Sequence, residues 1–176
     1  MMATSTFMIV FRILHIAARV VWAGSVFLFV VLIKPSAAAI GPASGPFMME
    51  LFGRRKMVSW LLWLAGATVV AGVFLYWRLW HDYGDLGDFA SSSYGLSLPL
   101  GAVAAIGAFL IGPFGTRPNV ARLLDLAARA AASEGWPPPE VAQQTPQVQA
   151  RLKVLARVAL VLIAVAVLAM ATARYW

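Results

Sequence analysis

Four long apolar stretches dominate the sequence and limit the folds that it can adopt. They lie at about 7–33, 57–80, 94–114 and 154–174, and each approaches or exceeds the roughly 20 residues that a membrane-spanning helix needs. Apolar residues make up 61% of the chain and charged residues 12%, whereas soluble domains average about 45–50% and about 25%. We therefore expect an all-α, integral membrane four-helix bundle that forms a single domain over residues 1–176.

Basic residues are unevenly distributed between the connecting segments, and this predicts the orientation of the chain. The first and third connections carry most of the Lys and Arg residues, whereas the connection at 81–93 carries three aspartates and no Lys or Arg. Because Lys and Arg favour cytoplasmic loops, we expect both termini outside, in a bacterial inner membrane. The net charge of +7 is explained by these loops, and no basic patch interleaved with aromatics predicts binding to nucleic acid.

The third connection contains an amphipathic pattern. Apolar residues recur at helical spacing over 119–133, Asn119 is a candidate N-cap, and charged residues occupy the other faces. The pattern predicts an interfacial helix that lies on the cytoplasmic membrane surface. A run rich in Gly and Pro at 135–139 is expected to end it, and residues 143–149 are expected to form a polar linker.

The first apolar stretch carries the residues with the greatest capacity for chemistry. At about 100° per residue, four side chains fall within one arc of about 80°: Arg12, His15, Arg19 and Trp22. A charge at the bilayer centre costs about 2.5–3.5 kcal/mol on insertion scales, and the four apolar stretches contain no Asp or Glu. Arg19 is therefore expected to face the bundle interior and to meet backbone carbonyls, water or an anionic ligand.

A b-type haem or a porphyrin would suit this group of side chains. His15 would ligate the iron, Arg12 and Arg19 would pair with the propionates, and Trp22 would pack on the ring. The alternative is a polar helix face satisfied by water and carbonyls. His81 suggests a second iron ligand, but the rise per residue puts it roughly 15 Å above the midplane, against roughly 7 Å for His15. His15 alone is the favoured ligand.

Other metal chemistry has weaker support in the sequence. His81, Asp82, Asp85 and Asp88 form a second candidate cation site, but such residues usually belong to solvated turns. Methionines carry Cu(I) in some proteins, yet the seven methionines here form no ladder across the membrane, and cysteine is absent. Since the sequence also shows no Ser–His–Asp set, phosphate loop or zinc-helix motif, no enzyme activity of the isolated chain is expected.

Several motifs resemble the CopD-like and HemJ-like four-helix bacterial membrane proteins. They are Leu14-His15-Ile16, Trp22-Ala23-Gly24, Lys34-Pro35, Arg54-Arg55 before Ser59-Trp60, and Gly72. A narrower likeness, to an uncharacterised subgroup, rests on 40–48, 76–78 and 170–176. HemJ-like proteins oxidise protoporphyrinogen IX and bind a b-type haem through a first-helix histidine, and the resemblance implies this role for His15. CopD-like domains are linked to copper uptake.

The chain departs from that pattern in its third apolar stretch. Ser97-Leu98-Pro99 stands where a lysine is expected, and Gly107-Ala108-Phe109 stands where a histidine is expected. These departures argue against the oxidase reaction and leave the haem or porphyrin site on His15. The first hypothesis is thus a membrane protein that binds haem or porphyrin for electron transfer or tetrapyrrole handling. The second is an accessory or scaffold subunit of a larger membrane complex, or a homo-oligomer, and the third is copper uptake.

Overall fold

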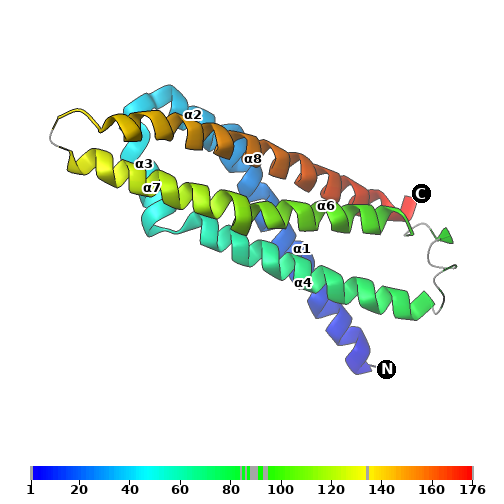
Figure 1. Cartoon of the computed structure of the whole chain (residues 1–176). Coiled ribbons are helices and arrows are strands. Elements are labelled where there is room, and N and C mark those ends of the chain that lie inside the picture. The colour runs from blue at the N-terminus through cyan, green and yellow to red at the C-terminus, as the bar shows by residue number, and fades with distance from the viewer. Residues whose placement is uncertain are drawn as a thin grey trace.

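The chain folds as an all-α bundle, shown as a computed structural model in Figure 1. The structure describes residues 2–83, 85, 87, 91–92, 95–133 and 135–175, and these include no strand. The longer helices are α1 (Met2–Leu28), α4 (Met57–Tyr83), α6 (Ser97–Ile111), α7 (Arg117–Ala132) and α8 (Pro139–Thr172). Four helical segments are long and apolar enough to cross a membrane, and some of them comprise several consecutive elements: Thr6–Arg54, Met57–Asp82, Ser97–Ala132 and Pro139–Thr172. The predicted membrane-spanning, four-helix fold class is confirmed.

Wide π-helical turns extend the first and third spans beyond their predicted ends. α1 continues through a π turn at Phe29–Ile33 into α2 (Lys34–Ile40), and α6 continues through a π turn at Gly112–Thr116 into α7. Pro35 is the second residue after the first turn, and Pro113 lies within the second. Proline lacks an N–H and clashes with the carbonyl four residues before it, and a wider turn relieves this clash without ending the helix.

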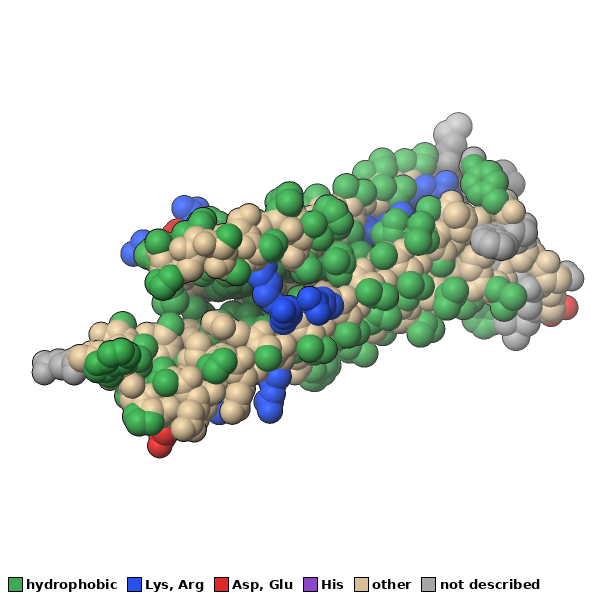
Figure 2. Space-filling view, turned by 90° about the horizontal axis from the view of Figure 1, so that it is seen from above, with side chains coloured by type: hydrophobic (Ala, Val, Ile, Leu, Met, Phe, Trp, Pro, Cys, Tyr) green, Lys and Arg blue, Asp and Glu red, His purple; other side chains and the backbone are tan. Residues whose placement is uncertain are grey.

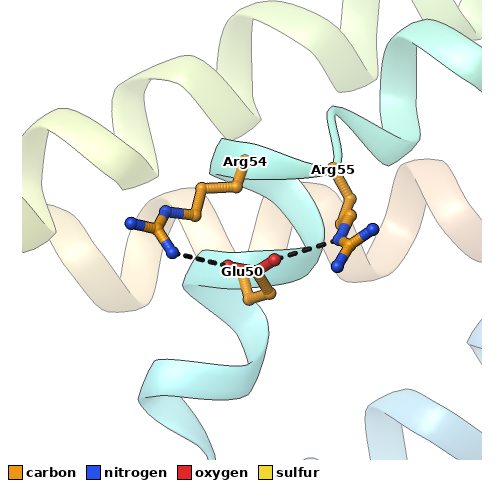
Figure 3. A network of polar contacts seen from close by, with 3 residues as sticks. All are labelled: Glu50, Arg54 and Arg55. Atoms are coloured by element: carbon orange, nitrogen blue, oxygen red, sulfur yellow. Dashed lines mark hydrogen bonds and ion pairs between the residues drawn. The ribbon is translucent and has the colours of Figure 1, made fainter.

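Short helical pieces connect α2 to α4. The helix stops at Gly41, whose φ of +71° is readily adopted only by glycine. A 3₁₀ turn (Gly41–Ser44), α3 (Gly45–Met49) and a π turn (Glu50–Arg54) then lead back toward α4. Figure 3 shows Glu50 between Arg54 and Arg55, with nitrogen–oxygen distances of 3.6 Å and 3.0 Å. These exposed ion pairs close the turn but contribute little stability.

The helices pack as two antiparallel pairs, α1 with α4 and α6–α7 with α8. Figure 1 shows both chain ends, the end of α4 and the start of α6 at one end of the bundle. The pieces α2 and α3 lie at the opposite end with the α7–α8 turn, and the basic connections gather there. The segregation of charge that the sequence predicts is thus a property of the folded molecule.

Small residues let the spans approach closely. The central cluster takes one buried residue from each span: Trp22, Ala65, Ala108 and Ile163. At Gly101 of α6, an added Cβ would lie 2.7 Å from Cγ of Met170 in α8, closer than real contacts allow. Close approach of this kind is how membrane helices gain packing energy, since lipid supplies no hydrophobic driving force between them.

The third connection differs in part from the prediction. The amphipathic helix is present as α7, but its apolar face is covered by protein, because Leu126 packs with Val141 and Val148 of α8. The predicted polar linker at 143–149 is wrong, since these residues are helical within α8. Pro at the start of a helix favours initiation, and the apolar residues at 141 and 148, two turns apart, give this polar segment a face to bury against α7.

Candidate functional site

His15 lies on the face of α1 that packs against α4, and a backbone carbonyl fixes its orientation. Its Nδ1–H donates to the carbonyl oxygen of Thr68, with nitrogen and oxygen 2.8 Å apart. The ring also rests against Gly72, where an added Cβ would lie 2.9 Å from Cε1 of the imidazole. The histidine therefore needs a glycine one turn beyond its hydrogen-bond partner, and any larger residue would displace the ring.

This hydrogen bond defines the chemistry of the other ring nitrogen. A carbonyl accepts only, so Nδ1 carries the proton of the neutral imidazole and Nε2 keeps its lone pair. The Thr68 hydroxyl donates to the carbonyl of Leu64 at 2.8 Å and does not compete for the ring. Histidine ligands of metals are commonly oriented in this way, with the second nitrogen bound to a carbonyl or carboxylate. Nε2 of His15 is thus available to a metal or a proton donor.

Arg19 lies one turn further along α1 and faces α8. Its Nη1 donates to Sδ of Met170 at 3.4 Å, and a thioether is only a weak acceptor. The half-buried guanidinium forms no ion pair with the described residues, whose ion pairs lie elsewhere. Because no described side-chain nitrogen is both fully buried and unbonded, the remaining N–H groups of Arg19 are reachable from outside the protein.

His15 offers a lone pair at Nε2, and Arg19 offers a positive charge. The two residues are about 6 Å apart along the axis of α1. Arg12 lies one turn nearer the N-terminus on the same side of α1, where it is exposed and outside every described ion pair. The arrangement can bind an anionic ligand that also presents a metal or a proton to Nε2. In the structure, Arg12, His15 and Arg19 follow one another along α1, with His15 against α4 and Arg19 toward α8.

Trp22 has a different environment from the other residues of the predicted group. Its side chain is only 5% exposed and packs in the central cluster against Ala65, Ala108 and Ile163. These contacts occupy the indole within the protein core, where all four spans meet. We therefore assign Trp22 to helix packing and do not include it in the candidate site.

His81 lies far from His15. His15 contacts Thr68, and His81 is thirteen positions further along α4 than Thr68, which is about 20 Å along a helix. His81 instead stacks edge-on against Trp77, with ring centroids 4.7 Å apart. With Phe7 and Phe74, among others, it lines an open cavity of about 550 Å³ at the end of the bundle where the termini lie.

The acidic residues near His81 do not form a metal site within the described residues, where no group of three or more His, Asp or Glu side chains converges. Asp82 forms an ion pair with Arg78, and the Asp85 carboxylate accepts a hydrogen bond from the Gly87 N–H at 3.1 Å. Asp88, the remaining member of the predicted cation site, lies outside the described residues. The two described aspartates therefore make local contacts typical of a helix end and a turn.

Comparison of the chain with protein-family models, with curated proteins and with solved structures gives no match. The likeness to CopD-like and HemJ-like proteins stays a prediction that rests on the motifs. Thr68 and Met170 are the site residues that sequence reasoning missed. A threonine and a glycine four residues apart in an otherwise apolar span were the available signal, because they mark the same face of α4.

Proposed function

We propose that the protein binds an anionic tetrapyrrole, haem b or a porphyrin, at His15 and Arg19. It would act in electron transfer or tetrapyrrole handling in a bacterial inner membrane, with both termini outside the cytoplasm. The observation that carries the proposal is the hydrogen bond from Nδ1 of His15 to the Thr68 carbonyl. This bond fixes the imidazole in a membrane span and leaves Nε2 free as a ligand.

The residues present fit a haem of this type. Nε2 of His15 would hold the iron, and the guanidinium groups of Arg19 and Arg12 would hold the propionates. A bound haem supplies one-electron redox chemistry, and the chain supplies its position and electrostatics. The Thr68 carbonyl makes the imidazole a stronger donor, and Gly72 gives the ring the room that this orientation requires.

The positive charge of Arg19 gives independent support for an anionic ligand. A guanidinium within an apolar span, with a thioether as its protein partner, lacks the carboxylate that usually accompanies a charge at this depth. A ligand carboxylate would supply that counter-ion. A plain metal ion would not, because its positive charge would be repelled by Arg19.

A reduced-minus-oxidised visible spectrum of the full-length protein, purified in detergent after expression with ample haem supply, tests the proposal. We expect a b-type α-band that is lost almost completely in His15→Ala and retained in the matched control His81→Ala. Both variants should elute as the native species, which separates loss of ligand from loss of fold. Absence of the band from the unmodified protein, or its retention in His15→Ala, would overturn the proposal.

A second candidate function is that of an accessory subunit in a larger membrane complex. Trp60 and Trp63 of α4 are 67% and 77% exposed and line a groove with Lys56 and Ser59. Large aromatic side chains of this kind are common anchors in protein interfaces. Crosslinking from these two positions in native membranes tests this role, which is compatible with a bound haem. Copper uptake ranks third, because the sulfur of Met170 already accepts a hydrogen bond from Arg19.

A further inference from the structure

Three basic residues from two elements meet at the end of the bundle that holds α2 and the α7–α8 turn. Lys34 is the first residue of α2 and is half-buried. Lys153 and Arg157 are four residues apart on α8, so they lie on one face of that helix. The π turn directly before Lys34 packs against α8, and this contact brings Lys34 near both of these residues, so that the three positive charges repel one another.

Among the residues that the structure describes, no acidic side chain forms an ion pair with this cluster. Within the described residues, the acids that form ion pairs at this end are Glu50, with Arg54 and Arg55, and Asp125, with Arg129. Lys34, Lys153 and Arg157 take part in none of these pairs, although other cations around them do. Three neighbouring positive charges repel one another strongly where water is partly excluded, so the cluster is stabilised by any anion that binds to it.

The cluster stands at the edge of the apolar part of the bundle. Lys34 directly follows the first apolar stretch, and Arg157 directly precedes the apolar run from Val158 to Thr172. Figure 2 shows the molecule hollowed at this end, with Lys and Arg side chains gathered at the inner end of the hollow. Basic groups in this position lie at the level of the lipid headgroups.

Apolar side chains continue from the cluster toward the membrane interior on both elements. Leu32, just before Lys34, is 53% exposed, and Val158 and Val161 of α8 are 45% and 61% exposed. A molecule whose phosphate contacts the cations would therefore have apolar protein surface for its acyl chains. Free inorganic phosphate would use only the charged part of this surface.

We propose that Lys34, Lys153 and Arg157 form a binding site for the phosphate group of an anionic membrane lipid. Arg157 provides the planar pair of N–H donors that suits a phosphate, and the two lysines add point charges. The site is separate from the proposed haem site, since Lys34 is fifteen positions after Arg19 in the chain, or about 22 Å along a helix. The two proposals concern different residues, so an experiment that rejects one of them does not reject the other.

Native mass spectrometry of the full-length protein, with phosphatidylglycerol, phosphatidylcholine or inorganic phosphate added, tests the site. The key variant is K34Q/K153Q/R157Q. The matched control, R54Q/R122Q/R129Q, removes the same charge from exposed positions at the same end. The exchange variant K34R/K153R/R157K keeps the three charges while it changes the same three positions. Loss of binding in the key variant alone is then not explained by a folding defect at these positions. Because each cation contributes roughly fivefold to binding of an anionic lipid, we expect the key variant to lose about a hundredfold in phosphatidylglycerol affinity.

The control and exchange variants should bind phosphatidylglycerol as the unmodified protein does, and phosphatidylcholine should bind weakly to all of them. Equal weakening in the key variant and the control would overturn the proposal, because binding would then follow net charge alone. Equal affinity for the two lipids would also overturn it. Inorganic phosphate that binds as tightly as phosphatidylglycerol, and only when the cluster is intact, would support the phosphate site but reject the lipid as its source.

Discussion

The two helix pairs of the bundle are held together by different means. Small apolar residues fill the interface between α6 and α8, where Ala104, Ala105 and Ala166 pack together. The interface between α1 and α4 instead contains a polar contact, from His15 to the Thr68 carbonyl. A packed interface of small residues needs no ligand, whereas a histidine and an arginine in a span must be satisfied. The interface between α6 and α8 therefore serves packing alone, whereas α1 carries the polar side chains on which the proposed binding role rests.

The largest effect is expected at the scaffold interface. In Gly101→Val, the new Cβ would lie 2.7 Å from Cγ of Met170 and 3.3 Å from the backbone oxygen of Ala166. Overpacking of this kind should lower the free energy of unfolding by about 3 kcal/mol, measured by thermal unfolding in detergent. Gly24→Val is the control, because nothing lies within 4 Å of its added Cβ. Equal losses in both variants would refute the close packing of α6 on α8.

The next effect concerns the glycine beneath the imidazole. Gly72→Ala forces the His15 ring to move, since the added Cβ would lie 2.9 Å from Cε1, and should cost about 1–2 kcal/mol of stability. It should also shift or weaken the proposed haem α-band. Gly66→Ala in the same helix should be nearly neutral, because its Cβ would be 4.0 Å from Phe109.

A double-mutant cycle sharpens this prediction. In a His15→Ala background, the cost of Gly72→Ala should largely disappear, since the clashing ring is gone. Persistence of the full cost would show that Gly72 serves some contact other than His15. The measurement is again the midpoint of thermal unfolding, compared across the four proteins of the cycle.

Arg19→Met should separate stability from binding. Replacing a charge that lacks an acidic partner with an apolar side chain of similar length should raise the free energy of unfolding by about 1 kcal/mol. The same change should weaken haem binding about tenfold, because a charged hydrogen bond to a propionate is lost. Thermal unfolding and a haem titration measure the two effects, with Arg12→Met as the exposed comparison. A loss of stability in Arg19→Met would mean that the guanidinium has a strong partner within the bundle.

The smallest effect is expected outside both helix pairs. Glu50→Gln removes the ion pairs with Arg54 and Arg55, and exposed pairs of this kind contribute about 0.5 kcal/mol or less. The midpoint of thermal unfolding should change little, and the change should be smaller still in high salt. A large drop would indicate that the turn before α4 contributes to the stability of the whole bundle.

The sequence predicted the architecture well because hydropathy and the positions of Lys and Arg are properties of whole segments. It placed Arg12, His15 and Arg19 on one face, since helical spacing alone determines this. It did not predict Thr68 as the partner of His15, because a backbone carbonyl carries no residue signature. Trp22 lies in the same arc of α1, but helical spacing does not show which residues of that arc are buried by the other three spans. The structure shows that Trp22 is one of them.

The error at 143–149 has a similar physical origin. This polar, glutamine-rich segment has low mean hydropathy. Val148 within it and Val141 just before it form an apolar face only when Leu126 lies opposite them. Tertiary contact thus created a helix that local composition disfavoured. Pro139 at the first position of α8 was the available signal that a helix begins there.

Each π turn is a position where the gain or loss of one residue would change the direction of the helix that follows it. In the first π turn, the N–H of Lys34 bonds to the carbonyl of Phe29, five residues back, so the turn contains one residue more than an α-helical turn. Removal of a single residue there would restore the regular ladder and rotate everything that follows by about 100°. Lys34 would then point away from α8, while α1, which precedes the turn, kept its packing against α4. One-residue insertions and deletions at such turns would let related chains redirect their basic ends without rebuilding the bundle.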